Sequence, residues 1–278
     1  MRKKEGGLRP IAIGYTLRHL AGKCANKYAT AKLASHFAPI QLGIGTPGGA
    51  EAAIHAVRRY AENLPKDYII AKLDFKTAFN TLRRDTMLEA IRRELPELYN
   101  FAHATYNGAP VLQFGDFTIH SAEGPQQGDP LSSAEYCLAI HPLLRRLISE
   151  LKVDYLDDVT LSGHRQIVVD DIKTIISKSE ELSHELNAAK CEVTYCDTST
   201  PHDDHVLKTF ERVGMADLTL FGAPILPGRA VDKALKEKTE VGEGDVHTPF
   251  VAVSRCSHSA PEQHQRFKAP LHSSIIRV

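Results

Sequence analysis

Short apolar runs alternate with helically spaced apolar positions along most of the chain. A continuous apolar run of strand length predicts a buried strand, and apolar positions every three or four residues predict a helix. The expected strands are 68–74, 152–155, 159–162 and 192–195, and the expected helices are 85–94, 131–150 and 170–186. We therefore predict an α+β fold in which these helices cover one face of a sheet.

Turn and cap signals refine this pattern. Gly115-Asp116 lies between two apolar stretches and predicts a separate hairpin at 111–119, because Gly-Asp is a favoured turn pair. Asp85 is of the type preferred at a helix N-cap, so it is expected to start the helix at 85–94. Pro142 is expected to kink the helix that contains it.

Tyr155-Leu156-Asp157-Asp158 is a polar turn between two apolar stretches. Asp is favoured in tight turns, and apolar flanks suit a hairpin. A turn that presents two carboxylates at a sheet edge can bind a divalent metal, because hard cations such as Mg²⁺ take oxygen ligands. The alternative interpretation is a solvated turn that binds nothing.

Two further segments place polar groups where a ligand could bind. Asp74 ends a predicted strand, where its charge faces either water or a ligand. The segment 123–133 carries Gly-Pro and Gly-Asp-Pro turn signals and leads into an apolar-periodic helix. Backbone N–H groups and amide side chains at such a helix start can meet an anionic ligand. An ordinary loop with a helix cap is the alternative.

Together these segments resemble the palm of a reverse transcriptase, most closely that of the non-LTR (LINE-like) retrotransposon type. Asp74 with Phe79, the loop 127–132 and the paired aspartates match the family motifs in order and spacing. Residues 7–13 resemble the fingers segment, and 41–52 resemble the loop and helix after it. Residues 187–192 resemble the lysine motif behind the palm, and 220–224 the strand pair that grips the primer. The resemblance runs from about Leu8 to about Lys238.

This resemblance implies a right-hand polymerase with most of its thumb missing. Residues 1–65 would be partial fingers, 66–227 the palm, and 228–278 a remnant or aberrant tail. Nucleotide addition moves a phosphoryl group to a primer 3′-hydroxyl, and two metal ions can activate that hydroxyl and stabilise the leaving oxygen. Asp74, Asp157 and Asp158 would hold two Mg²⁺ ions, or Mn²⁺ ions, with the Phe75 carbonyl as an added ligand.

The resemblance also implies roles for residues around the metals. Arg9 would pack on the incoming base and contact its triphosphate, a task suited to a planar, permanently charged group. Phe79 would fill the space that a ribose 2′-hydroxyl needs and so favour dNTPs. Gln127, beside Gly128, would lie near the sugar 3′-oxygen, and Lys190 would protonate departing pyrophosphate. The alternatives are surface solvation for Arg9 and Lys190, and core packing for Phe79.

Several features depart from the family pattern. Asn80 stands where a second acid is common, and Glu135 replaces an apolar residue after the loop. No endonuclease domain or zinc finger is recognised ahead of the polymerase segment. After about residue 240 the apolar periodicity of a helical thumb fails, so we expect a poorly ordered tail beyond Val241. A frameshift or misjoined exon is one hypothesis for this change, and the DNA sequence tests it.

Composition adds limits on partners and location. The 278 residues carry 34 basic and 34 acidic side chains, whereas nucleic-acid-binding proteins are usually basic. Arginine pairs such as Arg92-Arg93 serve either as phosphate contacts or as solvated helix faces. We therefore expect weak binding of an RNA template and a DNA primer. No apolar run approaches 18 residues and no secretory signal is visible, which predicts an intracellular protein, nuclear or cytoplasmic, with no membrane partner.

A competing site and competing functions remain open at this point. The sequence has five cysteines, and Cys191, Cys196, His202 and His205 could form a zinc site, although their spacing is loose for a structural finger. The functional hypotheses are an active polymerase domain, a truncated relic without useful activity, and a non-enzymatic nucleic-acid-binding protein. The fold alone does not choose between them.

Overall fold

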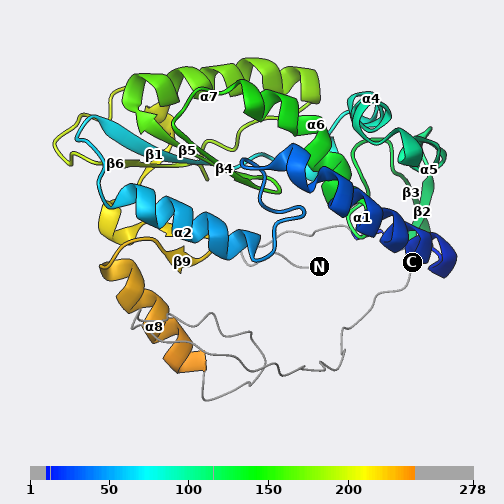
Figure 1. Cartoon of the computed structure of the whole chain (residues 1–278), viewed down its shortest axis with the longest axis horizontal. Coiled ribbons are helices and arrows are strands. Elements are labelled where there is room, and N and C mark those ends of the chain that lie inside the picture. The colour runs from blue at the N-terminus through cyan, green and yellow to red at the C-terminus, as the bar shows by residue number, and fades with distance from the viewer. Residues whose placement is uncertain (1–10, 13, 115, 242–278) are drawn as a thin grey trace.

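The computed structural model describes residues 11–12, 14–114 and 116–241, and the tail beyond Val241 lies outside them (Figure 1). The α-helices are α1 (Thr16–Phe37), α2 (Gly49–Ala61), α3 (Ala78–Thr81), α4 (Arg84–Glu94), α5 (Pro96–Tyr106), α6 (Ser132–Arg146), α7 (Arg165–Ser179) and α8 (Arg229–Val241). The strands are β1 (Tyr68–Leu73), β2 (Val111–Phe114), β3 (Phe117–His120), β4 (Leu151–Tyr155), β5 (Asp158–His164), β6 (Glu192–Tyr195), β7 (Glu211–Arg212), β8 (Thr219–Leu220) and β9 (Ala223–Pro224). Short 3₁₀ turns occupy Glu180–Leu182, Leu207–Thr209 and Met215–Asp217.

Five strands form one sheet in the order β4-β5-β1-β6-β7. The central strand β1 pairs antiparallel with β5 on one side and with β6 on the other, and β7 joins β6 in parallel. β4 and β5 form an antiparallel hairpin in which Tyr155 is aligned with Asp158. Because Leu73 is aligned with Val159, the end of β1 and the β4–β5 turn lie at the same end of the sheet.

The sheet has a core on each of its faces. Successive side chains of a strand point to opposite faces, and β1 accordingly places Leu73 in the larger core and Ile70 in the smaller one. α7 packs over β5 and β1, whereas α2 packs against β4 on the other side, so α7 lies above the sheet and α2 below it in Figure 1. The three predicted helices contribute residues to the larger core, as expected, whereas α2 covers the second face with Val57 and its neighbours.

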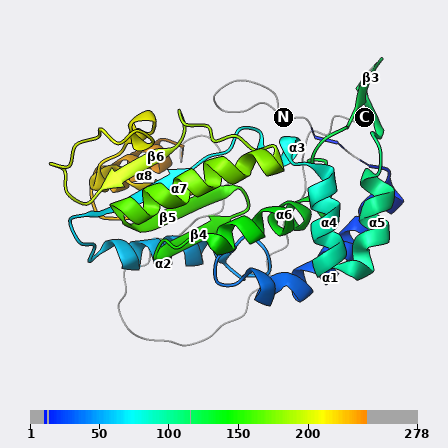
Figure 2. The same ribbon diagram turned by 90° about the horizontal axis from the view of Figure 1, so that it is seen from above.

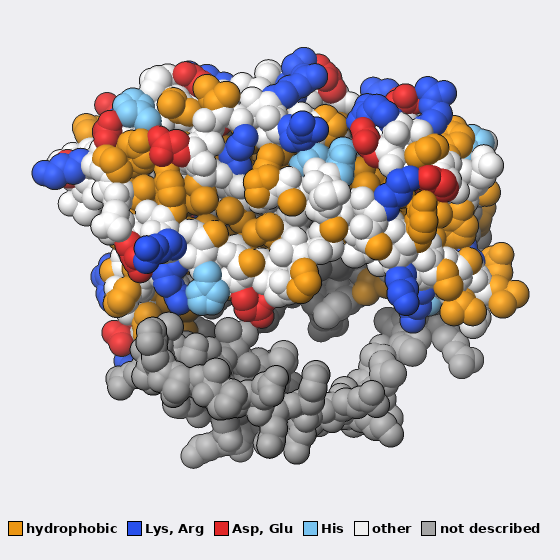
Figure 3. Space-filling model, in the orientation of Figure 1, with side chains coloured by type: hydrophobic (Ala, Val, Ile, Leu, Met, Phe, Trp, Pro, Cys, Tyr) orange, Lys and Arg blue, Asp and Glu red, His pale blue; other side chains and the backbone are white. Residues whose placement is uncertain are grey.

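A group of helices lies beside one end of the sheet, as Figure 2 shows. α6 packs against α4 and α1, and α4 packs against α5. The predicted hairpin is confirmed as a separate two-stranded sheet of β2 and β3, with Val111 aligned with His120. None of the helices in the described ranges is long and apolar enough to cross a membrane. Acidic and basic side chains are interspersed over the face shown in Figure 3.

Several local predictions need correction. α7 begins at Arg165, five residues before the predicted start, where the His164 ring accepts a hydrogen bond from Gln166 N. It ends at Ser179, followed by a 3₁₀ turn, and α6 ends at Arg146 with Pro142 inside one helix. The N-cap of α4 is Arg83, not Asp85. Asp85 instead lies in the first turn, where its negative charge interacts favourably with the helix dipole.

Candidate active site

The predicted aspartates converge at the end of the sheet. Asp74 directly follows β1, and extending the β1–β5 register by one residue places it opposite Asp158. Asp157 lies in the two-residue turn between β4 and β5, after Leu156, whose φ is 63°. Antiparallel pairing therefore brings together side chains that are more than 80 positions apart in the sequence. The half-buried Asp74 and the exposed Asp158 both reach solvent.

Negative charge is concentrated at this point. Nearby protein atoms limit hydration of the Asp158 carboxylate, and Asp157 and Asp74 add negative charge, so the pKa of Asp158 rises to about 6 although Lys72 opposes the shift. Burial, and then the charges of Asp157 and Asp158, raise the pKa of Asp154 well above its ordinary value. A site that disfavours its own ionised carboxylates is one where a bound cation is stabilised.

Asp74 is held in place by the segment that precedes β6. Asn187 Nδ2 donates a hydrogen bond of 2.9 Å to Asp74 Oδ2, and Asn187 N donates to the Asp74 carbonyl at 2.8 Å. The buried Cys191 thiol lies 3.4 Å from Asp74 N. Phe75 forms an isolated bridge with Leu186, and its ring lies 5.5 Å from that of His184. The backbone that carries Asp74 and Phe75 is therefore fixed from a distant part of the chain.

The loop before α6 is anchored by a buried polar network. Arg18 of α1 forms an ion pair of 2.9 Å with Asp129, whose side chain is 6% exposed, and a hydrogen bond of 3.1 Å with Gln126. The Tyr106 hydroxyl donates to Asp129 at 3.2 Å and accepts from Gln126 N at the same distance. These contacts leave the next residue, Gln127, half-buried, with its carbonyl accepting from Ala12 N at 2.7 Å.

Gly128 has a physical reason to be glycine. Its φ is 108°, and an added Cβ would meet the Ala12 carbonyl oxygen at 2.5 Å. Ala12, which belongs to the stretch 7–13 that resembles the fingers segment, thus packs closely against the loop. Arg9 itself lies outside the described residues, so its predicted contact with a nucleotide stays a prediction.

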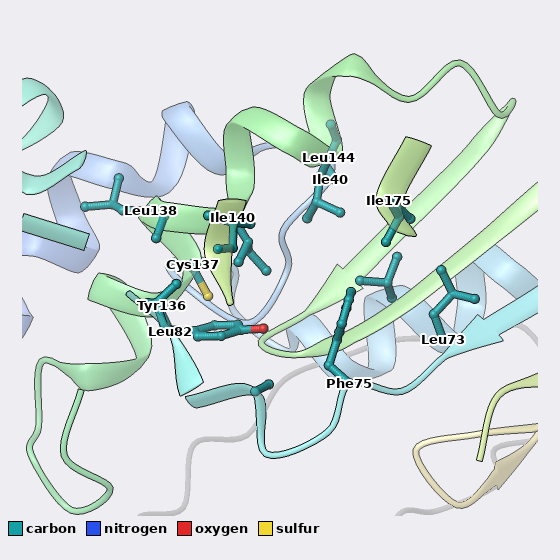
Figure 4. Packing of buried hydrophobic residues seen from close by; sticks show 14 of the residues in the cluster. Ile40, Leu73, Phe75, Leu82, Tyr136, Cys137, Leu138, Ile140, Leu144 and Ile175 are labelled. Carbon is teal, nitrogen blue, oxygen red and sulfur yellow. The ribbon is translucent and has the colours of Figure 1, made fainter. Parts of the chain in front are cut away.

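Phe79 is half-buried and stacks on Tyr136 of α6, with ring centroids 4.4 Å apart. Tyr136 is fully buried, and its pKa is raised well above the ordinary value by burial and then by Asp157. Figure 4 shows its hydroxyl directed at the β4–β5 turn. Phe79 thus packs on the core, as the alternative interpretation expected, and part of its surface stays exposed.

A second hairpin touches the aspartate turn. β8 and β9 are joined by Phe221-Gly222, whose φ values of 51° and 76° fit a type I′ turn. The Phe221 ring lies 5.0 Å from that of Tyr155. The predicted strand pair at 220–224 is therefore confirmed as a hairpin, and its tip packs beside the turn that carries Asp157.

Other predicted residues have different environments. Lys190 is exposed and lies in the turn before β6, where its N–H donates to the Asn187 carbonyl at 2.8 Å. In the described part of the chain, no three His, Cys, Asp or Glu side chains are grouped closely enough to hold a metal ion. Of the residues of the zinc alternative, Cys191 is engaged with Asp74, and His202 bonds Tyr195 and the Phe210 carbonyl. Asp74, Asp157 and Asp158 likewise do not form such a group of three in the described structure.

The sequence analysis assigned no role to three residues that support the site. Asn187 and Gln41 belong to stretches that resemble the family, and Tyr136 lies in the predicted helix 131–150. Gln41 is 1% exposed and bonds Leu156 in the aspartate turn. The available sequence signal for Gln41 was an amide side chain two positions before Gly43, in a stretch that resembles a family loop.

A comparison with protein families decides the relationship of this chain. Residues 1–239 match the family described as reverse transcriptase (RNA-dependent DNA polymerase). The chain belongs to the reverse transcriptase family. Its mixed α+β structure, with the aspartates at the end of the central strands, agrees with a partial palm and fingers.

Solved structures of telomerase share the fold of this reverse transcriptase-family chain. Apo telomerase from Candida tropicalis has a TM-score of 0.50 and 11% identity, over 66% of this chain and 38% of that one. The telomerase of Candida tropicalis in complex with the TWJ fragment of telomeric RNA also has a TM-score of 0.50, with 13% identity over 68% and 35% of the two chains. This chain thus spans less than two fifths of either telomerase. A search of curated proteins found no match.

Proposed function

We propose that this chain is the RNA-directed DNA polymerase domain of a non-LTR retrotransposon. It would add deoxynucleotides from dNTPs to a primer 3′-hydroxyl on an RNA template. The observation that carries the proposal is the meeting of Asp74 and Asp158 at adjacent strand ends, with Asp157 in the turn between β4 and β5. The family match supports the reaction class, and the order of the sequence motifs supports the subtype.

The donor set at the strand ends fits two divalent cations. Carboxylates and a backbone carbonyl are the hard oxygen ligands that Mg²⁺ prefers, and Asp74, Asp157, Asp158 and the Phe75 carbonyl would supply them. The pKa of Asp158 is raised by limited hydration and then by the negative charges of Asp157 and Asp74, which bound cations would offset. Because no three of the described side chains yet share one point, we expect carboxylate rotations to complete the site. Bound ions would lower the pKa of the attacking hydroxyl and stabilise the leaving oxygen.

The remaining residues would position the substrates. Asn187 would hold the Asp74 carboxylate in its orientation through the 2.9 Å hydrogen bond. The Phe79 ring, fixed against Tyr136, would exclude a ribose 2′-hydroxyl. The anchored loop at Gln127 and Gly128 would contact the nucleotide sugar. Arg9 would contact the triphosphate, and Lys190 would protonate the departing pyrophosphate.

Domain limits follow from the same proposal. Residues 1–65 would be partial fingers, 66–227 the palm and 228–278 a remnant or aberrant tail. α2, although before residue 66, packs against β4 and shares a core with Ile70 and Val153. The proposed boundary at 65 therefore follows the sequence motifs and cuts through a packed unit.

A second candidate function is nucleic-acid binding without catalysis. Two observations favour it: the open arrangement of the aspartates and the burial of Glu135 in the helix that follows the nucleotide loop. Such a protein would bind a primer–template equally well with and without its aspartates.

Primer extension separates the two candidates. Wild type, Asp157→Ala and the control Asp170→Ala would be assayed on an RNA template with Mg²⁺ and with Mn²⁺, and primer–template affinity would be measured by anisotropy. Asp170 is exposed on α7 and lies outside the site. A polymerase predicts extension by wild type and the control, with a loss of at least about 10³-fold in Asp157→Ala. Binding by all three without extension would support the second candidate.

A further inference from the structure

The turn that carries Asp157 holds a bulky residue in an unfavourable conformation. Leu156 has a φ of 63°, in the left-handed region that side-chain-bearing residues other than Asn and Asp seldom adopt. Such a conformation persists only where the surroundings hold it in place. The contacts of Leu156 therefore decide where the next two residues, Asp157 and Asp158, point.

The side chain of Gln41 bonds both backbone polar groups of Leu156. Its Oε1 accepts from Leu156 N at 3.0 Å, and its Nε2 lies 3.3 Å from the Leu156 carbonyl oxygen. Oε1 also accepts from Gly43 N at 2.7 Å, and Nε2 donates to the carboxyl of Asp154. One side-chain amide thus forms hydrogen bonds with both backbone polar groups of a turn residue that lies 115 positions away in the sequence.

Backbone pairing fixes Gln41 itself. Asp154 N donates to the Ile40 carbonyl at 2.9 Å, and Leu42 N donates to the Asp154 carbonyl at 2.8 Å. Gln41 is 1% exposed and Asp154 fully buried. The loop before α2 therefore forms a bridge along β4, and the Gln41 amide reaches from that bridge to the turn.

The turn and the loop are also packed tightly. A Cβ added to Gly43 would meet Leu156 Cδ2 at 2.8 Å and Gln41 Oε1 at 2.9 Å. Gly43 thus leaves the space into which the Leu156 side chain fits. The hydrogen bonds and this steric fit act on the same residue from one segment.

We propose that Gln41 is a positioning residue for the reaction, in that its amide holds Leu156 in the left-handed conformation that presents Asp157 and Asp158. This inference rests on the proposed polymerase function. It assigns Gln41 no contact with substrate or metal, and it makes the segment 40–43 part of the catalytic apparatus.

Two variants and a matched control test the proposal. Gln41→Met keeps the side-chain length but cannot form the four contacts, and Gln41→Glu keeps the two acceptor bonds and loses the donors. Gln166→Met is the control, since Gln166 is exposed on α7 and its side-chain amide bonds Asp170 on the same helix. For each, kcat and the dNTP KM would be measured in primer extension, together with amide hydrogen exchange of a peptide covering 155–159.

A positioning role predicts a selective effect. In Gln41→Met, kcat should fall about 10- to 100-fold, as expected for a small misplacement of reacting groups, while the dNTP KM changes less than about 2-fold and exchange in 155–159 accelerates. Gln166→Met should behave as wild type. An unchanged kcat, or a rise in KM that accounts for the whole loss, would overturn the proposal. Should Gln41→Met lose its cooperative melting, Gln41→Glu carries the same test.

A rescue experiment tests the geometry further. The double variant Gln41→Glu with Asp154→Asn restores a hydrogen bond between positions 41 and 154 with the donor and acceptor exchanged. It should recover about 5-fold of the kcat lost in Gln41→Glu, in the range of coupling energies for residues in contact. No recovery would exclude the Asp154 contact from the mechanism. Exchange of 155–159 separates this proposal from the proposed function: a wild type without extension would refute the polymerase, and unchanged exchange in Gln41→Met would refute the positioning role.

Discussion

The rings of Phe79 and Tyr136 stack with centroids 4.4 Å and planes 19° apart. The Tyr136 hydroxyl is buried and has no hydrogen-bond partner in the described part of the chain, and the same residue interacts with Asp157. One aromatic side chain of α6 thus packs under both the candidate sugar-contacting residue and the aspartate turn. The orientation of Phe79 depends on a residue that cannot touch the nucleotide itself.

Replacing Tyr136 should alter sugar discrimination. Tyr136→Leu removes the ring on which Phe79 stacks, so we expect the ratio of kcat/KM for dNTP over rNTP to fall roughly 10-fold, a change typical of a lost apolar contact. Tyr136→Phe keeps the ring and removes an unpaired buried hydroxyl, and should stabilise the protein by about 1 kcal/mol without changing the ratio. Single-nucleotide incorporation assays measure both. An unchanged ratio in Tyr136→Leu would show that Phe79 is not oriented by Tyr136.

Arg84 should be a major source of stability. It is 9% exposed, and its guanidinium donates to the carbonyls of Gly108 at 2.8 Å and Gly124 at 3.0 Å, and to Ser121 Oγ at 2.8 Å. Arg84→Ala leaves several buried acceptors unpaired and should cost about 3 kcal/mol of unfolding free energy.

The fork geometry of the guanidinium provides the control for Arg84. Arg84→Lys supplies a single ammonium that cannot span these acceptors, so it should recover less than half of the loss. Arg59→Ala, at an exposed position on α2, should change stability little. Urea unfolding measures all three variants. A full recovery by lysine would contradict the role of the fork.

Removing the buried carboxyl of Glu135 should stabilise the protein. Burial and then Asp129 raise the pKa of Glu135 well above its ordinary value of 4.5, and Oε2 has no hydrogen-bond partner among the described residues. The folded state therefore keeps a proton that the unfolded chain releases, so stability falls as pH rises above about 4.5. Glu135→Leu should gain about 1 to 3 kcal/mol at pH 8 and less at pH 5.

Urea unfolding at both pH values tests this prediction. Glu89→Leu, at an exposed position of α4, is the matched control and should show no such pH dependence. A loss of stability in Glu135→Leu at pH 8 would indicate that the carboxyl is needed by Tyr106 or Arg84.

His141 should make the fold sensitive to acid. It is 1% exposed, and its Nε2 lies 2.9 Å from the His36 carbonyl. Burial and then His36 and Arg145 lower the pKa of His141 to about 4, while Glu94 opposes the shift. Below pH 6.5, the ordinary pKa of histidine, the unfolded chain therefore binds a proton at His141 that the folded state does not bind. Stability should fall by about 2 kcal/mol between pH 6.5 and pH 4 from this residue.

The acid sensitivity is measured by thermal or urea unfolding across that pH range. His141→Gln keeps a donor for the His36 carbonyl and does not titrate, so its curve should be flatter than that of wild type by this amount. His205→Gln, at an exposed position, should follow wild type. Parallel curves for wild type and His141→Gln would show that the pKa of the histidine is the same in the folded and unfolded states.

Much of the site was predictable because its signals are local. Strand-length runs identified β1 and β6, and turn chemistry identified the hairpins at 111–119 and 155–158, which the structure contains with small shifts of boundary. The sequence places Asp74 at the end of one predicted strand and Asp157 and Asp158 in a turn beside another. Antiparallel pairing of β1 and β5 brings these positions together. The contacts that Arg9 and Lys190 would make with a nucleotide stay predictions.

The residues that hold the aspartates in place depended on tertiary structure. The sequence by itself determined the element types, the turn that carries Asp157 and the position of Asp74 at the end of a strand. It could do so because backbone propensity and side-chain period act over a few neighbouring residues. Only the packed structure decided that Gln41 bonds Leu156, that Asn187 bonds Asp74 and that Glu135 is buried. The physical reason is that burial and hydrogen-bond partners come from segments distant in sequence, and layer packing and strand register place those segments together.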